Sequence, residues 1–222
     1  MSIDLGIIQV TSNLKETHPR CILMKEKVIP SCISASNKNY VLVSPLKPAM
    51  QSFVEESGGV FSVYEGWDVD KMRKFRQGLE YMKAEWVGIF DDDIVLDVNW
   101  KTEMEEFLKD KPPGQYGFRL TNEDNQRHQF GEDWMQFANQ KRRLVHRPLN
   151  YDIQTGYVED SPTAYVANSI VHKNVLAKIE PFGLFGKAPD VMWSFAIRQC
   201  GFPIGFNPKA RAYHVGNRKD HR

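Results

Sequence analysis

Short apolar runs alternate with helical patterns in the first hundred residues, and this order constrains the fold more than any other feature of the chain. The apolar runs span 3–10, 39–44, 60–64 and 86–90, and the helical patterns span 20–29, 49–57 and 68–83. Strands that alternate with helices form parallel sheets covered by helices. Ligands of such sheets bind beyond the carboxyl ends of the strands. Pro30 is expected to end or kink the first helix.

The rest of the chain reads as a mixed α+β region. Helical patterns cover 101–108 and 190–200, and strand-like runs lie near 115–121, 143–147 and 163–171, with a strand-like tail reaching 215. No repeat, low-complexity segment or shift of composition marks a second unit. We therefore expect a single domain over 1–222.

Composition excludes several classes of function. The 222 residues carry a formal net charge of +1, whereas nucleic-acid-binding domains are usually strongly basic. No apolar run approaches the ~20 residues of a membrane span, and the first residues lack the pattern of a signal peptide. Cys21, Cys32 and Cys200 are odd in number and lack CxxC spacing, which favours free thiols in a reducing compartment. These features predict a cytoplasmic protein.

Three aspartates, Asp91, Asp92 and Asp93, follow the fourth strand-like run directly. Strand alternation would point Asp91 and Asp93 to one side and Asp92 to the other. An Asp-x-Asp pair suits Mg²⁺ or Mn²⁺, and the ion would in turn hold phosphate oxygens. A solvated acidic turn is the alternative, but such turns seldom follow a buried strand.

A second informative stretch runs from 188 to 216. A helical pattern begins at Pro189 and Asp190. The helix dipole favours an acid in the first turn, so Asp190 has a sufficient structural role as a cap. Trp193 lies at the spacing of a core residue. His214 falls in the strand-like tail, where a lone histidine is either packed or a ligand. The residues alone leave the capping and functional interpretations of Asp190 open.

The two stretches together resemble a GT-A-fold glycosyltransferase, most closely the inverting family 2 enzymes. That family shows a strand ending in Asp-x-Asp, a helix that begins with an acid and ends in Arg-x-x-Gly, a tail of the form Pro-x-Ala-x-x-x-His, and a Gly-(apolar) pair upstream. The matching positions are Asp91 and Asp93, then Asp190, Arg198 and Gly201, then Pro208, Ala210 and His214, with Gly78 and Leu79 upstream. The chain more loosely resembles the glycosyltransferase domains with which large algal DNA viruses decorate capsid protein, which implies a viral protein in host cytoplasm.

Two departures accompany the resemblance. The family's second strand ends in Asp-Asp-Gly-Ser, whose first acid helps to read the nucleobase, whereas this strand ends in Ser44-Pro45-Leu46-Lys47. The family's Asn before the helix glycine is replaced by Arg76.

The resemblance implies an α/β fold of GT-A type: a Rossmann-like, mostly parallel central sheet flanked by helices, with a mixed α+β acceptor-side half. Residues 1–98 would bind the nucleotide sugar, and residues 99–222 would form the acceptor and catalytic half. The implied reaction is metal-dependent transfer of a sugar from a nucleoside-diphosphate sugar, UDP- or GDP-linked, to a hydroxyl group of a glycan or glycoprotein.

The resemblance also implies roles in the reaction. Asp190 would be the general base that takes the proton of the acceptor hydroxyl, giving inversion. Mn²⁺, or Mg²⁺, would be held by Asp93, with Asp91 and His214 alongside, and Asp91 could instead contact the ribose.

Further residues are implied as binding residues. Those expected at the nucleotide sugar are Thr11, Ser12, Arg73, Arg76, Asp92, Arg218 and Lys219, and those expected to stack on the acceptor are Trp134 and Trp193. The arginines at 73 and 76 equally suit an exposed helix face, and the basic pair at 218 and 219 equally suits a frayed tail.

Three other functions remain open from the sequence. A retaining glycosyltransferase would share the metal site, and a nucleotidyltransferase would share the aspartates but leave Asp190 and His214 unexplained. A non-catalytic sugar-binding or scaffold domain would keep the fold without turnover.

Overall fold

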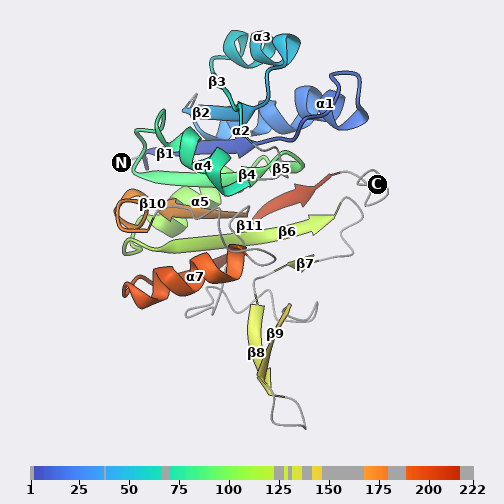
Figure 1. The fold of residues 1–222 in the computed structure, drawn as a ribbon. Coiled ribbons are helices and arrows are strands. Elements are labelled where there is room, and N and C mark those ends of the chain that lie inside the picture. Colours follow the sequence, from blue (N-terminus) through green and yellow to red (C-terminus); the bar gives the residue numbers. More distant parts are fainter. Residues whose placement is uncertain are drawn as a thin grey trace.

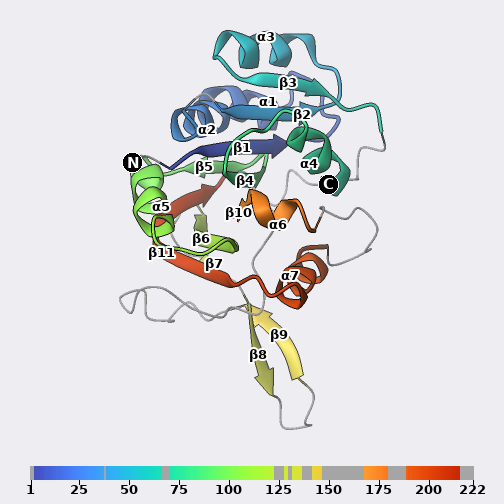
Figure 2. The same ribbon diagram turned by 90° about the vertical axis from the view of Figure 1, so that its left-hand side faces the viewer.

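A nine-stranded mixed sheet organises the protein (Figure 1). The computed structural model describes residues 3–37, 39–66, 71–122, 128–129, 132–136, 142–146, 168–179 and 189–215. The strands follow the order β3-β2-β1-β4-β10-β6-β11-β5, and β7 pairs with β6 beside this path. Two further strands, β8 and β9, form a separate hairpin that extends away from the sheet (Figures 1 and 2).

The first half of the chain alternates strands and helices as its apolar pattern predicts. Its elements are β1 (Leu5–Val10), α1 (Pro19–Leu23), the π-helix η1 (Met24–Val28), α2 (Ile29–Ala35), β2 (Tyr40–Ser44), α3 (Pro48–Glu56), β3 (Val60–Val63), α4 (Lys71–Leu79) and β4 (Trp86–Asp91).

The second half completes the sheet and adds helices to it. Its elements are β5 (Ile94–Leu96), α5 (Trp100–Leu108), β6 (Gln115–Asn122), β7 (His128–Gln129), β8 (Glu132–Gln136), β9 (Arg142–His146), β10 (Asn168–His172), α6 (Lys173–Leu176), α7 (Pro189–Gln199) and β11 (Ile204–His214).

The sheet is mostly parallel, as expected. Strands β1 to β4 pair in parallel, and so do β6 and β11. Strand β10 runs antiparallel to both β4 and β6 and joins the two parallel parts into one sheet. The short β5 runs antiparallel to β11. The predicted α/β architecture with a mixed second half is confirmed.

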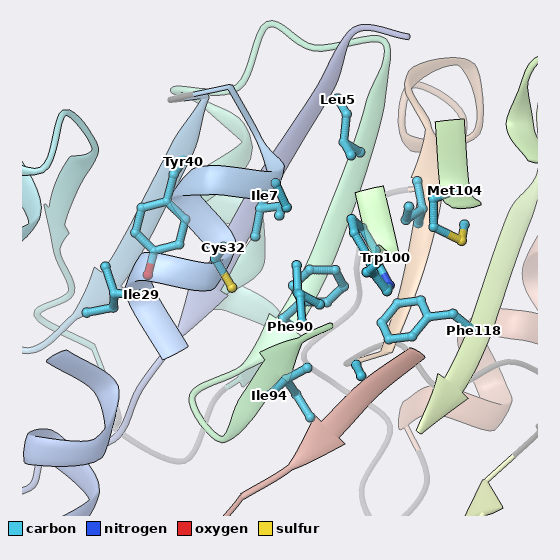
Figure 3. Packing of buried hydrophobic residues seen from close by; sticks show 14 of the residues in the cluster. Leu5, Ile7, Ile29, Cys32, Tyr40, Phe90, Ile94, Trp100, Met104 and Phe118 are labelled. Carbon is cyan, nitrogen blue, oxygen red and sulfur yellow. The ribbon is translucent and has the colours of Figure 1, made fainter. Parts of the chain in front are cut away.

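Both faces of the sheet are buried, which explains why the strands read as continuous apolar runs. Successive residues of β1 point to opposite faces, so Ile7 packs beneath α1, η1, α2 and α5 while Ile8 packs beneath α4, α6 and α7. The first of these cores is centred on the rings of Phe90, Trp100 and Phe118, which meet edge to face (Figure 3). Helices on both faces leave the ends of the strands as the place for a site.

Pro30 does not end the first helical segment, which was one of the two outcomes expected there. The chain stays helical from Pro19 to Ala35, with a π-helical turn just before Pro30. In that turn the Ile29 N–H donates to the Met24 carbonyl, five residues back. The wider turn accommodates a residue that lacks an N–H and whose ring crowds the preceding turn.

Other boundaries also differ from the sequence expectations. Helix α4 ends at Leu79 rather than near 83, and its expected start at 68 lies outside the described residues. The expected strand at 163–171 is seen as β10 (Asn168–His172), and its first part likewise lies outside them. Strands β5, β7 and β8 were not foreseen, because runs of two to five residues carry too little periodicity.

Among the described residues, no helix combines the length and the apolar character that crossing a bilayer requires.

Replacing Gly78 by alanine is expected to destabilise the protein, because α4 lies directly against β1 at this point. A Cβ atom at 78 would lie 2.4 Å from Ile8 Cγ2 and 3.1 Å from Val43 Cγ2, and both neighbours are fully buried. We expect the free energy of unfolding in urea to fall by roughly 1–2 kcal/mol, since overpacking against two fully buried side chains costs about 2–3 kcal/mol and alanine regains about 1 kcal/mol of helix propensity.

Ser52→Ala on the exposed face of α3 is the control, and it should change this free energy by less than about 0.5 kcal/mol. An unchanged stability of Gly78→Ala would contradict the close contact between α4 and β1.

Candidate functional site

The acidic cluster lies where the sequence places it, at the carboxyl edge of the parallel strands. Asp91 ends β4, and the chain turns through Asp92 and Asp93 into β5. The buried Gln9 of β1 donates from Nε2 to the Asp91 carbonyl over 2.7 Å, which ties the turn to the neighbouring strand. The three carboxylates are therefore held on rigid elements.

Each carboxylate meets a cation. Lys71 Nζ lies 2.6 Å from Asp91 Oδ1 and 2.7 Å from its Oδ2. A single atom, Arg20 Nη2, lies 2.5 Å from Asp92 Oδ1 and 2.6 Å from Asp93 Oδ2. The expectation that Asp91 and Asp93 point together and Asp92 away is wrong. The chain turns after Asp91, so strand alternation does not continue and Asp92 and Asp93 converge on Arg20.

The last strand brings His214 to the same cluster. His214 pairs with Ile94 across β11 and β5, and the Val215 N–H donates to the Asp93 carbonyl over 2.8 Å. His214 Nε2 lies 3.1 Å from Asp93 Oδ2. Two residues separated by more than a hundred positions in the chain thus meet through strand pairing.

The surroundings shift the pKa of each acid differently. Partial burial raises the pKa of the Asp91 carboxyl to about 6, against the lowering effect of Lys71. Burial also raises the pKa of Asp92, although Arg20 opposes it. Burial would raise the pKa of Asp93 too, but its hydrogen bond to His214 and the charges of His214 and Arg20 prevail and lower it. Asp93 is thus the acid that ionises most readily, as a metal ligand must.

Three of the cations around the cluster were missed from the sequence, and each comes from a strand-to-helix connection. Arg20 is the second residue of α1, Lys47 precedes α3, and Lys71 is the first described residue of α4. A cation at the start of a helix is unfavourable for the helix dipole. These connections lie at the carboxyl edge of the sheet. Basic residues in them could therefore have indicated that cations gather around the carboxylates there.

Two buried lysines hold the loop after β1. Lys74 is 2 % exposed and donates from Nζ to the Thr11 carbonyl over 2.8 Å. Lys47 is 4 % exposed and donates from Nζ to the Ser12 carbonyl over 2.6 Å. The Thr11 hydroxyl in turn donates to Asp92 Oδ2 over 2.5 Å. Thr11 and Ser12, expected at the nucleotide sugar, therefore lie beside the carboxylates.

The donor atoms suit a divalent cation that takes further ligands from a substrate. Within the described part of the chain, no group of three His, Cys, Asp or Glu side chains is arranged to hold an ion alone. Asp93 and His214 offer two ligands, and Asp93 Oδ1 is buried without a hydrogen-bond partner among the described residues. Mg²⁺ and Mn²⁺ are often held by one or two protein ligands together with substrate phosphates. The pair fits such an ion.

Trp193 requires a correction. It is 1 % exposed and packs with Ile197 in the core beneath α7. No face of its ring is open to stack on an acceptor, so its helical spacing reflects the core.

The sequence left two alternatives open for Arg73 and Arg76, a contact with the nucleotide sugar and an exposed helix face. Both are exposed on α4, and Arg76 lines a cavity of about 470 Å³ together with Met82, Ala84 and Lys173. Those neighbours lie near the start of β4 and the end of β10, at the opposite edge of the sheet from the carboxylates. The structure therefore separates Arg76 from the acidic cluster.

The remaining predicted residues have no described side chains. The backbone places Asp190 in the first turn of α7 and Trp134 in β8, but their side chains lie outside the described part. Arg218 and Lys219 lie outside the described residues altogether.

Comparison with known proteins identifies the fold. No protein-family model matches the chain, and no curated protein matches it in sequence. The structure of GalNAc-T7 with UDP, GalNAc and Mn²⁺ matches with a TM-score of 0.70 and 13 % identity, over 97 % of this chain and 44 % of that one. The fold is GT-A. At this identity the similarity establishes a shared fold.

Staphylococcus aureus TarS has the same fold. Its residues 1–349 match with a TM-score of 0.65 and 12 % identity, over 99 % of this chain and 62 % of that one. A longer TarS structure matches with a TM-score of 0.66 and 12 % identity, over 99 % of this chain and 38 % of that one. The chain thus spans less than two thirds of the length of each of these proteins.

Thr11→Val tests the hydrogen bond that fixes Asp92. The substitution keeps the shape of the side chain but removes a buried donor to a carboxylate, so the free energy of unfolding in urea should fall by about 2 kcal/mol. Thr121→Val is a matched control, because the Thr121 hydroxyl on β6 is buried without a hydrogen-bond partner among the described residues. The control should be neutral or stabilising. Equal effects of the two substitutions would argue against a structural role for the Thr11–Asp92 bond.

Proposed function

We propose that the protein is a glycosyltransferase that moves a sugar from a nucleoside-diphosphate sugar to a hydroxyl group of a glycan or glycoprotein. The donor is UDP- or GDP-linked. The half up to residue 98 binds the donor, and the half from 99 supplies the acceptor side and the base. The observation that carries the proposal is the Asp93–His214 pair, with its unpartnered buried oxygen, at the carboxyl edge of a GT-A sheet.

Asp93 and His214 are the residues that would hold Mn²⁺ or Mg²⁺, and the ion would supply positive charge for the diphosphate leaving group. The structure of GalNAc-T7, which shares this fold, contains UDP and Mn²⁺, and this supports a divalent cation in the proposed reaction. Asp91 is more exposed than the other two acids and pairs with Lys71, and in this proposal its carboxylate meets the rest of the nucleotide.

The protein's own cations prepare the site for a diphosphate. Arg20, Lys47, Lys71 and Lys74 surround the loop after β1 and the turn after β4. Fixed positive charges stabilise a leaving group as negative charge develops on it, at no cost of reorganisation. This excess of cations distinguishes the cluster from a site built only to retain a structural ion.

Asp190 completes the proposed reaction as general base. It takes the proton of the acceptor hydroxyl while the oxygen attacks the anomeric carbon from the side opposite the diphosphate, which inverts the configuration. Its place in the first turn of α7, just after Pro189, supports an ionised carboxylate through the helix dipole.

Binding of Mn²⁺ and UDP is tested by thermal unfolding. At UDP about 100-fold above its Kd, binding adds about 2.7 kcal/mol, which raises the Tm of a domain of this size by several degrees. Asp93→Asn should abolish the part of the shift that requires Mn²⁺. Asp110→Asn, at an exposed position after α5, should retain it. Absence of a shift with UDP or GDP, with or without Mn²⁺, would contradict the proposed donor.

Asp190→Asn tests the base. With an acceptor that wild-type protein glycosylates, the substitution should lower kcat by about 10²–10⁴-fold while leaving the UDP-dependent thermal shift unchanged. NMR of the product should show an inverted anomeric centre. A retained configuration would point to the retaining mechanism, and pyrophosphate release from a nucleoside triphosphate would point to nucleotidyl transfer. Donor binding without any turnover would leave a sugar-binding domain.

A further inference from the structure

Arg20 occupies the position in which a cation neutralises two carboxylates at once. Its Nη2 atom lies 2.5 Å from Asp92 Oδ1 and 2.6 Å from Asp93 Oδ2. The two acid side chains are only 7 % and 6 % exposed, whereas the Arg20 side chain is 21 % exposed. The guanidinium therefore enters the cluster from its rim, and Asp93 Oδ1 is left without a partner among the described residues.

Adding a divalent ion to this cluster creates a conflict of charge. The three carboxylates carry three negative charges, and the four cations around them, Arg20, Lys47, Lys71 and Lys74, already outnumber these charges. An ion at Asp93 would lie within a few ångströms of the Arg20 guanidinium, where partly buried charges are poorly screened by salt. An additional anion between the two cations would relieve their repulsion. A nucleoside diphosphate is such an anion.

We propose that Arg20 couples the metal to the donor: it is the counter-cation of Asp92 and Asp93 in the free protein, and it turns to the diphosphate when the donor binds, which releases Asp93 to the metal. This inference rests on the proposed function. The planar guanidinium suits both partners, since it pairs with carboxylates and with phosphates through the same N–H groups. Metal and nucleotide then bind synergistically, and neither binds tightly alone.

Lys71 offers an internal comparison. It pairs with Asp91, and both side chains of this pair are about a third exposed, at 33 % and 35 %. Solvent screens an exposed pair, so it contributes little. Removing the Lys71 charge should therefore alter metal binding at Asp93 less than removing the Arg20 charge.

Titration with Mn²⁺, followed by the electron paramagnetic resonance of the free ion, tests the coupling directly. Without UDP, Arg20→Gln should bind Mn²⁺ more tightly than wild type, by a factor in the range of about 5 to 150 that is usual for coupled sites. With saturating UDP this advantage should disappear. Lys27→Gln removes a charge from an exposed position of the neighbouring η1 and should match wild type in both conditions.

The outcomes separate the two proposals. If wild type binds Mn²⁺ with UDP but Arg20→Gln gains no affinity without UDP, the coupling is overturned and the proposed metal site stands. If no variant binds Mn²⁺ in either condition, both are overturned. If Arg20→Gln does not fold, the wild-type protein provides the test. The NMR signal of its Arg20 guanidinium is assigned as the one that is lost in Arg20→Lys. This signal should move when Mg²⁺ and UDP are added together and should stay in place with Mg²⁺ alone. A stationary signal overturns the coupling.

Discussion

Three carboxylates side by side at the end of a buried strand repel one another. The cations gathered at the carboxyl edge of the sheet offset this repulsion. Lys71 meets Asp91, Arg20 bridges Asp92 and Asp93, and His214 reaches Asp93 from the last strand. A buried charge without a partner is far more costly than a buried pair. Each acid of the cluster therefore has a cation as its partner.

The sheet makes this arrangement possible by fixing the strand ends relative to one another. Both faces are buried, and the cores above and below are close-packed, so that Gly78 leaves no room for a methyl group against Ile8. Buried polar bonds then tie the ends together, as Gln9 does for the Asp91 carbonyl. A site built on strand ends held in this way is positioned more precisely than one built on loops alone.

The similarity to GalNAc-T7 and TarS establishes a shared GT-A fold at 12–13 % identity. Most side chains therefore differ, and the chemistry must be argued from this chain's own residues. Here the second strand leads into Lys47, and the buried amine of that residue holds the Ser12 carbonyl. A cation at this position adds positive charge beside the carboxylates, which agrees with the diphosphate donor proposed above.

The sequence by itself determined the alternation of strands and helices, the single predominantly parallel sheet and the position of the aspartates at its carboxyl edge, because these follow from local periodicity and strand order. Only the tertiary structure decided which charges meet. Arg20 and Asp93 lie 73 positions apart, and His214 reaches Asp93 through the pairing of β11 with β5. The tertiary structure also shows that Trp193 lies in the core and that Arg76 lies at the edge of the sheet opposite the carboxylates. Side-chain contacts across a sheet depend on register, which no local pattern encodes.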